Sequence, residues 1–526
     1  MKRRLVALLL EELPRLAWVA EIDRHADVVV LRHGQGVEVH GNFAVEGIWD
    51  GPFTEGAFSN RGHFFGSGLR IEGQRVTFSA SSALVDRLVY AVAHDQVLCS
   101  NSLPLLLGRT RARLDDCHDY TAECHALMAG KRRYPKAFHV VASDFEFGQV
   151  YGENLSVTAD AIEHVGRDAA TALLRTFAEY ERALHERLEA LFRNIRDPAR
   201  NHPVQVVSTV STGYDSVAVA VLGRQYGVRE CFTTSGDTDP ALENGVDVAN
   251  ALGLRPSVMH RAAPDPLAEL FLLAATLDGR EAIFASMVEQ LCSTGEVTAV
   301  LTGYHGDKMW SRDASGDYLS PDIMRGDTSG LNLAEARLLG GFINVPIPFL
   351  FASQIKDVVA ISNSQEMAPW QLGNDYDRPL PRRLAETAGL DRNRFGQKKS
   401  VVMDYDLLPR NKTVRKELFR YLTDRFGYGA MSHIAHELVR ALDYRLAVVP
   451  FTKPSSSLQR HVWPGERQLA NRIFVWSVNR VADRMAEWLR RAEPERTSDS
   501  EAAASTRPRS RRAHPGRASS TANEAR

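Results

Sequence analysis

Residues 204–222 are VQVVSTVSTGYDSVAVAVL, and this stretch decides the fold. It begins as an apolar, β-branched run, which is typical of a buried parallel strand. Small and hydroxylated residues around Gly213 follow, and the stretch ends in an alanine, valine and leucine run that is compatible with a helix. A strand, a tight polar turn and a helix together aim backbone N–H groups and a helix N-terminus at an anion. The stretch therefore predicts an anion-binding turn in an α/β fold.

The side chains of this turn suit a phosphate accompanied by a cation. Ser211, Thr212 and Ser216 offer hydroxyl donors, and Gly213 lets the backbone come close to a ligand. Asp215 places a carboxylate where a phosphate would sit. A carboxylate is useful there only if a cation comes with the phosphate, and Mg²⁺ is the simplest choice.

The order Ser-Thr-Gly-Tyr-Asp-Ser matches neither of the two common phosphate loops, G-x-x-x-x-G-K-[ST] and G-x-G-x-x-G. It resembles the pyrophosphate loop S-G-G-x-D-S of the N-type ATP pyrophosphatases, which are also called PP-loop enzymes. Four of the five fixed positions match, and Thr212 replaces the first glycine. An ordinary strand-to-helix turn rich in turn-forming residues is the alternative.

The composition indicates an ordinary soluble protein. The chain has 526 residues, with 64 basic against 65 acidic side chains, so nothing in the charge balance calls for nucleic acid or an anionic membrane. Residues 1–10 imitate a signal peptide, but Glu11 and Glu12 interrupt the apolar run and no cleavage site follows. No apolar run is long enough to span a membrane. The five cysteines suit reduced thiols, so we expect a cytoplasmic protein.

Residues 1–160 are predicted to form a β-rich domain, with strands at 27–32, 68–71, 76–78 and 88–92 and a late hairpin formed by 138–141 and 148–151. Residues 87–91 and 97–107 resemble the end of the glutaminase domain of asparagine synthetases, where a strand pair leads into a short helix. In that family a cysteine after the initiator Met is the nucleophile that releases ammonia from glutamine. Here that position is Lys2 and the first cysteine is Cys99, so we expect a degenerate glutaminase-like domain without that chemistry. An unrelated β domain is the alternative.

Residues 161–492 are predicted to form the second domain. A mostly helical segment at 160–200 precedes the opening strand, and further strands at 230–235, 256–260 and 297–303 alternate with helices at 243–252 and 266–291. Such alternation predicts an open parallel sheet, which binds ligands at the carboxyl ends of its strands. Further helices are expected at 413–450 and 466–490, and a disordered tail at 493–526. The predicted fold class is α/β, with a β-rich first domain and an open-sheet PP-loop (HUP-like) synthetase domain with extra helices.

A second polar turn follows the strand at 297–303. The segment LTGYHGDKMW, residues 301–310, resembles L-S-G-E-G-A-D-E of asparagine synthetases, and its tyrosine three residues before the aspartate resembles the β-lactam and carbapenam synthetases. The resemblance implies that Gly303 belongs to the ATP site and that Asp307 is a second Mg²⁺ ligand beside Asp215. Two Mg²⁺ ions on a triphosphate need oxygen ligands from more than one loop, which agrees with this assignment. A helix N-cap is the alternative for Asp307.

The same resemblance extends to catalytic residues. In β-lactam synthetases a Gly-Leu-Asn-Glu segment supplies a glutamate that works with the tyrosine as a base pair. Tyr304 takes the place of that tyrosine, and Glu335 lies two residues beyond the matching glutamate position, which is Leu333 here. Lys398 or Lys399 would touch the α-phosphate, where a fixed cation stabilises the charge that builds up in adenylation. An exposed helix carboxylate and a solvated basic loop are the respective alternatives.

The resemblance implies an AMP- and pyrophosphate-forming carbon–nitrogen ligase that uses ATP and Mg²⁺. A small-molecule or peptide carboxylate would attack the α-phosphorus of ATP, and the acyl-adenylate would pass to an amine or to ammonia. An intramolecular cyclase of the β-lactam or lasso-peptide type is one alternative. A PP-loop tRNA-modifying enzyme is another, although it would need a basic face and suitably placed cysteines. Lys2 and Thr212 also leave open a non-catalytic nucleotide-binding protein.

Overall fold

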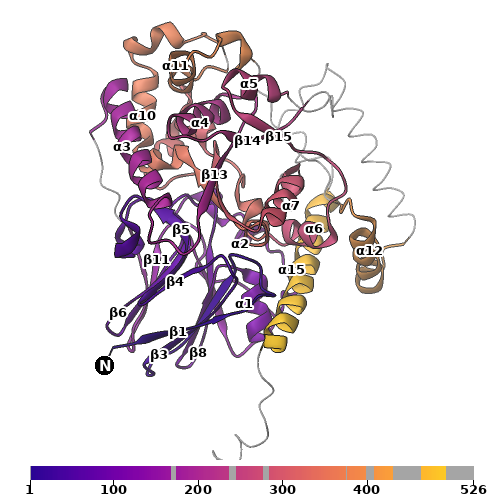
Figure 1. Cartoon of the computed structure of the whole chain (residues 1–526). Coiled ribbons are helices and arrows are strands. Elements are labelled where there is room, and N and C mark those ends of the chain that lie inside the picture. Colours follow the sequence, from indigo (N-terminus) through magenta and orange to yellow (C-terminus); the bar gives the residue numbers. More distant parts are fainter. Residues whose placement is uncertain are drawn as a thin grey trace, which may run out of the picture.

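A computed structural model describes residues 2–167, 173–235, 244–275, 283–374, 376–397, 408–429 and 464–492. The chain forms a β-rich N-terminal part, in indigo and violet, and a mixed α/β part with a parallel sheet above it (Figure 1). The predicted coarse fold, β-rich first and α/β second, is therefore confirmed. None of the helices in the described part of the chain combines the length and apolar character that a membrane span requires.

The β-rich part contains two six-stranded sheets. Their strands are antiparallel except for one parallel pair, formed by β1 and β3. Buried side chains of both sheets, such as Leu31 from the first and Phe78 from the second, share one apolar core, so the sheets pack face to face. The first sheet has the order β1 (Arg4–Leu9), β3 (Val28–His33), β2 (Trp18–Asp23), β9 (Gln96–Ser100), β8 (Leu88–Ala93), β10 (Glu146–Val150). The second has the order β12 (Ile162–Val165), β11 (Asn154–Val157), β7 (Arg75–Ser79), β6 (Phe64–Glu72), β5 (Phe43–Trp49), β4 (Glu38–His40).

Most strands predicted for the N-terminal part are present, and the predicted strand pair followed by a short helix forms as β8, β9 and α1 (Leu103–Thr110). The late hairpin is half right, because 146–150 forms β10 while 137–141 contributes only a bridge at Ala137. The predicted helical character is wrong for 162–165, which form β12, and 168–172 lie outside the described residues. Because β12 pairs with β11, the sheet extends to Val165. The helix α3 begins only at Phe177 and ends at Ile195.

The α/β part is built on a five-stranded sheet of order β15-β14-β13-β16-β17, in which every pair is parallel. The chain runs outward from β13 to β15 and then returns to β16 on the other side of β13. The predicted open parallel sheet is thus confirmed, and β17 extends it beyond the strands expected from the sequence. Its strands are β13 (Val204–Thr209), β14 (Glu230–Thr233), β15 (Arg255–Val258), β16 (Val297–Thr302) and β17 (Phe342–Pro346).

The helices of this part differ from the expectation mainly in length. The single helix predicted at 266–291 is two helices, α6 (Pro266–Leu273) and α7 (Ala285–Thr294), with 276–282 outside the described residues. Much of the helix predicted at 413–450 and all of the tail predicted at 493–526 also lie outside them. The remaining helices are α2 (Thr121–Cys124), α4 (Tyr214–Gln225), α5 (Val246–Ala251), α8 (Gly306–Met309), α9 (Ala336–Gly340), α10 (Ile355–Ser362), α11 (Pro379–Thr387), α12 (Lys412–Phe426) and α15 (Pro464–Ala492).

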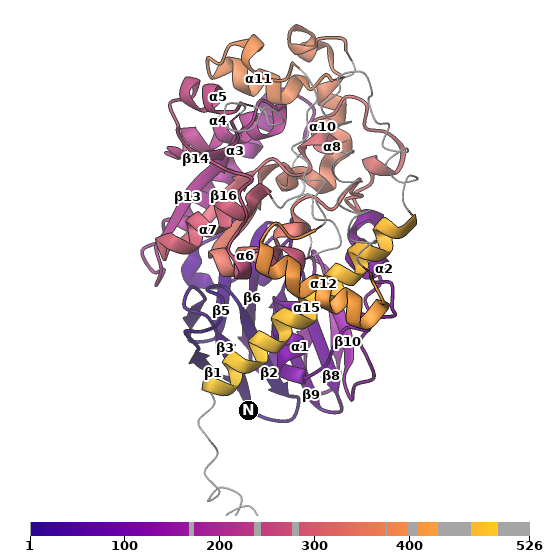
Figure 2. The same cartoon turned by 90° about the vertical axis from the view of Figure 1, so that its right-hand side faces the viewer.

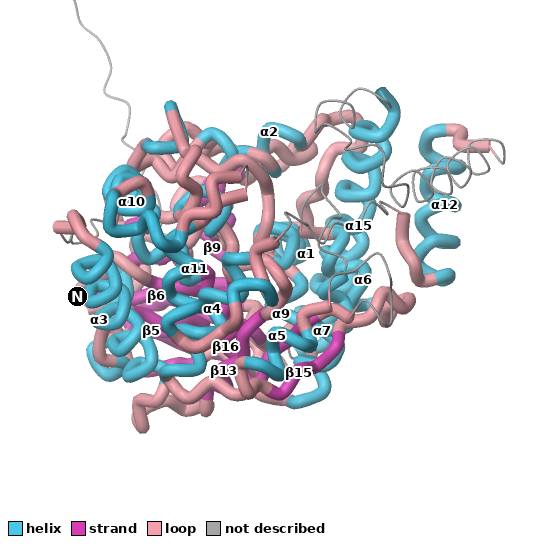
Figure 3. Tube along the Cα trace, turned by 90° about the horizontal axis from the view of Figure 1, so that it is seen from above, coloured by secondary structure: helices cyan, strands magenta, loops and turns pink. Residues whose placement is uncertain are grey.

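The last described helix returns to the N-terminal part. In Figure 2, α15 runs diagonally across α1 and the strands behind it, and in the view from above it lies with α12 at one side of the molecule (Figure 3). A Cβ added at Gly108 of α1 would lie 2.7 Å from the carbonyl oxygen of Ala482, so the glycine permits the close crossing of α1 and α15. The last described helix is therefore packed against α1 of the β-rich N-terminal part.

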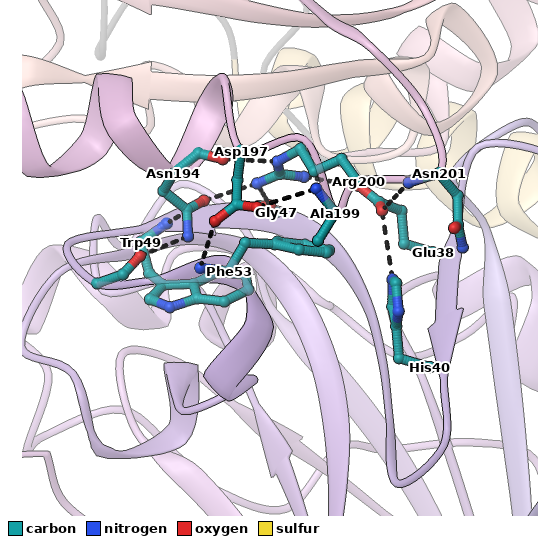
Figure 4. Close-up of polar contacts among 11 residues, drawn as sticks. Glu38, His40, Gly47, Trp49, Phe53, Asn194, Asp197, Ala199, Arg200 and Asn201 are labelled. Atoms are coloured by element: carbon teal, nitrogen blue, oxygen red, sulfur yellow. Dashed lines mark hydrogen bonds and ion pairs between the residues drawn. The ribbon is translucent and has the colours of Figure 1, made fainter.

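A buried arginine fixes the entry into β13. Arg200 lies between α3 and β13, and its guanidinium is 2.7 Å from the Glu38 carboxylate, with both side chains only 4% exposed (Figure 4). It also donates to the carbonyl oxygen of Gly47 at 3.0 Å and lies 4.3 Å from the centre of the Phe53 ring. These contacts tie the first strand of the parallel sheet to the β-rich part, so the loop that follows β13 stands on a fixed base.

Candidate functional site

The two polar turns predicted from the sequence lie side by side. β13 and β16 are neighbours in the sheet, with Ser208 opposite Leu301, so the turns that follow them leave the same sheet edge. This is also where the chain direction across the sheet reverses, between β13 and β16. In open α/β sheets, ligands bind in the crevice at the carboxyl ends of the strands at such a switch point.

Two glycines let the second turn close onto the first. A Cβ added at Gly303 would lie 2.8 Å from the backbone carbonyl carbon of Asp215 and 2.9 Å from the backbone nitrogen of Ser216. A Cβ added at Gly306 would lie 2.6 Å from the Asp215 carboxyl carbon. Real Cβ atoms do not approach so closely, so both positions require glycine. The loop of Asp307 is thereby placed against Asp215, as the predicted shared site needs.

The first turn is organised by its own hydroxyls. The Ser211 and Ser216 hydroxyls are 2.7 Å apart, and the Ser216 hydroxyl accepts a hydrogen bond from the Ser211 backbone N–H at 3.0 Å. The Gly213 N–H donates to the Ser211 hydroxyl at 3.1 Å. The predicted loop residues therefore lie together at the N-terminus of α4. Their hydroxyl and amide groups are the donors that a phosphate would use.

Gly213 is not needed for the backbone conformation. Its φ is −79° and its ψ is 155°, which any residue can adopt. An added Cβ would meet the Ser211 hydroxyl oxygen at 3.3 Å and the Tyr376 hydroxyl oxygen at 3.7 Å. The space beside Gly213 is therefore open enough for a methyl group, and a ligand that approaches the loop closely would need that space.

We expect Gly213→Ala to leave the fold intact and to weaken nucleotide binding about tenfold, a cost of roughly 1.4 kcal/mol. The alanine methyl group meets no backbone atom, but it stands where a phosphate would approach the loop. Calorimetric titration with a Mg²⁺–ATP analogue measures the affinity, and a thermal melt checks the fold. An unchanged affinity in the folded variant would show that no ligand approaches Gly213 closely.

The replacement of glycine by Thr212 causes no backbone strain, since Thr212 is not among the residues with positive φ. Its carbonyl oxygen accepts a hydrogen bond from the Gly396 N–H at 2.8 Å. Arg382 reinforces this contact, because its guanidinium donates to the Tyr214 hydroxyl and to the Gly396 carbonyl oxygen. The segment that ends at residue 397 is thus docked on the first turn. Lys398 and Lys399, predicted to follow it as the α-phosphate cation, lie outside the described residues.

Each of the two predicted Mg²⁺ ligands is paired with a cation. Arg378, at the start of α11, donates to the Asp215 carboxylate, and the Lys308 ammonium lies 3.1 Å from the Asp307 carboxylate. Burial would by itself raise the pKa of Asp307, but Lys308 and Arg378 hold that pKa below its usual value. The carboxyl group of Asp307 is therefore held in its ionised form, as an oxygen ligand for a divalent cation must be.

A cleft of about 320 Å³ opens beside these charges. Asp307, Lys308 and Arg378 line one part of it, and the Tyr318 and Tyr376 side chains contribute aromatic surface. The cleft is therefore mainly polar and charged, with a smaller aromatic contribution, which suits a charged ligand better than an apolar one. Its other lining residues are Ser311, Asp313, Ala314, Ser315 and Asp377.

Tyr304 and Glu335, which the sequence predicts to act as a pair, lie in different surroundings. Tyr304 packs against the segment at Gly330, where an added Cβ would lie 3.2 Å from its ring. Glu335 instead holds the start of α1, because it accepts hydrogen bonds from the Ser102 hydroxyl at 2.7 Å and the Leu103 N–H at 2.9 Å. Both of its oxygens are thus engaged between the two parts of the fold. These contacts give the Glu335 carboxylate a structural role at the start of α1.

We expect Glu335→Gln to change the pH dependence of stability. Burial raises the pKa of Glu335 to about 7 from 4.5, against the two hydrogen bonds that lower it. The folded state therefore holds this proton more tightly than the unfolded state, so the native protein loses up to about 3 kcal/mol as pH rises from 4.5 to 7. The neutral, isosteric glutamine removes that slope.

Urea unfolding at pH 5 and pH 8 measures the change. Between pH 5 and pH 8, wild type should lose more of its free energy of unfolding than the variant does. An identical pH profile in the two proteins would contradict the prediction. If Glu335 were a base, the variant would also lose activity without losing stability, and we expect activity to be kept.

Three cations at the site were not predicted from the sequence: Lys308, Arg378 and Arg382. Lys308 directly follows the predicted ligand Asp307, and Arg378 and Arg382 lie in the basic, proline-containing run RPLPRR at 378–383. That run was the available signal, since clustered arginines suit phosphate groups. Arg378 donates to the Asp215 carboxylate and Arg382 to the Tyr214 hydroxyl. Both partners lie far away in the sequence, so these two contacts had no local signature.

The carboxylates suit Mg²⁺ only together with a polyphosphate. In the part of the chain that the structure describes, His, Cys, Asp and Glu side chains nowhere gather in groups of three or more that could hold a metal ion. Asp215 and Asp307 would supply two protein ligands, so phosphate oxygens and water would have to complete the coordination, as is usual for Mg²⁺. A scan against models of known protein families finds no match, and a search of curated proteins finds no similar protein.

Proposed function

We propose that this protein is an ATP-dependent amide-forming enzyme that activates a carboxylate as an acyl-adenylate and releases AMP and pyrophosphate. One observation carries the proposal. Two polar turns at neighbouring parallel strand ends are held together by Gly303 and Gly306, which brings the Asp215 and Asp307 loops into one site. The resemblance of both turns to asparagine synthetases and β-lactam synthetases supplies the reaction class.

In this proposal the protein positions ATP and neutralises charge. The hydroxyls of Ser211 and Ser216, the Gly213 N–H and the backbone around Thr212 bind the pyrophosphate portion of ATP. Asp215 and Asp307 would hold Mg²⁺, which supplies charge neutralisation for the pyrophosphate leaving group. Lys398 or Lys399 would stabilise the α-phosphoryl group, and the segment that precedes them is docked on the carbonyl oxygen of Thr212.

The acid substrate would bind in the adjoining cleft and attack the α-phosphorus. Its carboxylate oxygen forms a bond to phosphorus as the bond to the β-phosphate bridging oxygen breaks, which leaves an acyl-adenylate. An amine nitrogen then attacks the acyl carbon and AMP leaves with the electron pair of the broken bond. Tyr304, from the second turn, remains the candidate for relaying the proton that the amine loses, because its hydroxyl can accept that proton while it passes its own proton to water.

We further propose that the β-rich part is a glutaminase-like fold that has lost its nucleophile. Its two face-to-face sheets support this assignment. Cys99 is fully buried in β9, and burial raises the pKa of its thiol well above the usual value, so it would not replace the missing group. Ammonia, an amine substrate or a second protein would then supply the nitrogen. The five cysteines are free, which also supports a cytoplasmic location.

The test is ATP–pyrophosphate exchange with labelled pyrophosphate and pools of carboxylic acids, with Mg²⁺ present and then omitted. Exchange requires the acid but no amine, so the nitrogen source need not be known. We expect Mg²⁺-dependent exchange with one acid class and AMP as the nucleotide product. Formation of ADP, or failure to bind an ATP analogue with Mg²⁺, would refute the proposal. Incubation with glutamine should release no glutamate.

A further inference from the structure

The carboxylates that would hold Mg²⁺ have resident counter-ions. The Arg378 guanidinium forms an ion pair with Asp215, and its side chain is only 7% exposed. The Lys308 ammonium pairs with Asp307 at 3.1 Å and also lies 5.0 Å from the centre of the Tyr318 ring. Both cations line the cleft described above. A divalent cation that reached these carboxylates would therefore compete with side chains already in place.

Arg378 has neighbours on two sides in the site. Its guanidinium donates to the Asp215 carboxylate, and its guanidinium carbon lies 5.1 Å from the centroid of the Tyr376 ring. Arg378 is thus the resident counter-ion of the Asp215 carboxylate.

The backbone beside Arg378 is anchored, so an exchange of partners would have to be made by its side chain. The preceding residue, Asp377, accepts hydrogen bonds at 3.0 Å from the backbone N–H groups of Leu372 and Gly373 and from the Arg312 guanidinium. An arginine on a fixed backbone can turn its planar fork from a carboxylate to a phosphate oxygen, since both accept the same paired N–H groups.

The charge balance decides when that exchange occurs. Asp215 and Asp307 carry two negative charges, and Arg378 and Lys308 carry two positive charges, so the formal sum is zero. A divalent cation arriving alone would displace a buried guanidinium that then has no anion, which is costly. A triphosphate arriving with the cation supplies that anion. The balance therefore favours joint entry of metal and nucleotide.

We propose that Arg378 is a nucleotide-binding residue that exchanges partners, pairing with Asp215 in the empty site and with a phosphate oxygen of ATP in the loaded site. The inference rests on the function proposed above. It adds that Arg378 weakens the binding of free metal and strengthens the binding of metal–nucleotide. A merely structural arginine would not affect these two affinities in opposite directions.

The experiment compares wild type, Arg378→Gln, Arg378→Lys and the control Arg392→Gln. Arg392 also pairs with a carboxylate, Glu386, but at the exposed surface. Mn²⁺ binding is followed by electron paramagnetic resonance, first with Mn²⁺ alone and then with Mn²⁺ and α,β-methylene-ATP. Thermal melts with and without Mn²⁺ report whether each variant is folded.

We expect Arg378→Gln to bind Mn²⁺ alone about tenfold more tightly than wild type and Mn²⁺–nucleotide about tenfold more weakly, since a charge-assisted hydrogen bond is worth about 1.5–3 kcal/mol. Mn²⁺ should also raise the melting temperature of this variant more than that of wild type. Arg378→Lys should fall between the two, and Arg392→Gln should match wild type.

Unchanged or weaker binding of Mn²⁺ alone would overturn the exchange, and unchanged nucleotide affinity would overturn the phosphate contact. Wild type that binds Mn²⁺ but no nucleotide would instead overturn the proposed function, and the phosphate contact with it.

Discussion

Replacing Arg337 by methionine should lower the free energy of unfolding by about 3–5 kcal/mol, because it leaves buried carboxylates without their counter-ion. Arg337 lies on α9 and reaches into the β-rich part. Its guanidinium donates two parallel hydrogen bonds to Glu46, at 2.8 and 2.9 Å, and a third to Asp86 at 2.5 Å. The exposed fractions of these side chains are 1% for Arg337, 0% for Glu46 and 3% for Asp86. The three charges therefore depend on one another and not on water.

The pKa of Asp86 shows that burial destabilises an ionised carboxylate at this position. Burial raises that pKa to about 6 even though Arg337 opposes the shift. Without Arg337, the opposing effect on the pKa of Asp86 is lost, so Asp86 would have to take up a proton for the protein to stay folded. The loss of stability should therefore be larger at pH 8, where protons are scarce, than at pH 5.

Urea unfolding at the two pH values measures this loss, with Arg392→Gln as the control. Because Arg392 pairs with Glu386 at the exposed surface, its replacement should cost less than about 1 kcal/mol. A second variant, Arg337→Met combined with Glu46→Leu and Asp86→Leu, should recover part of the stability, because no buried charge remains. A loss below about 1 kcal/mol for Arg337→Met at pH 8 would contradict the proposed importance of this buried cluster.

Local pattern was enough to predict the parallel sheet and its two polar turns. The strands at 204–209 and 297–302 are apolar runs followed by glycine and hydroxyl-rich turns, and such runs form strands with little help from distant residues. The close approach of Gly303 and Gly306 to Asp215 follows from the neighbouring positions of these strands. The turn residues could therefore be placed together from the sequence.

Contacts between residues far apart in the sequence decide the features that local pattern did not predict. Residues 162–165 form a strand because β11 provides a partner edge, although the surrounding sequence favoured a helix. Glu335 stands close to the motif position of a catalytic glutamate. Its carboxylate accepts hydrogen bonds from the Leu103 N–H at the start of α1 and from the Ser102 hydroxyl. Arg378 and Arg337 meet partners far away in the chain, in Asp215 and Glu46 respectively, and no local spacing indicates such pairs.

Replacing Asp307 by asparagine should reduce Mg²⁺-dependent ATP–pyrophosphate exchange at least about a hundredfold while the protein stays folded. The lost carboxylate would otherwise hold the Mg²⁺ that neutralises and positions the phosphate groups, and a single preorganised group at a reacting centre is worth about this much. The fold tolerates the change because the partner of Asp307 is Lys308, whose side chain is 25% exposed and can reach water. Affinity for Mn²⁺–nucleotide should fall together with exchange.

Asp215→Asn provides the informative comparison, since it should lose both activity and stability. Its partner Arg378 is 7% exposed, so the variant leaves a nearly buried guanidinium without its anion. We therefore expect a melting temperature several degrees below that of Asp307→Asn for a similar loss of exchange. Asp317→Asn, an exposed aspartate in the same part of the chain, should match wild type in both measurements. If Asp307→Asn kept its exchange activity while Asp215→Asn lost it, Asp307 would not be a metal ligand, and the two-loop site would reduce to the first turn alone.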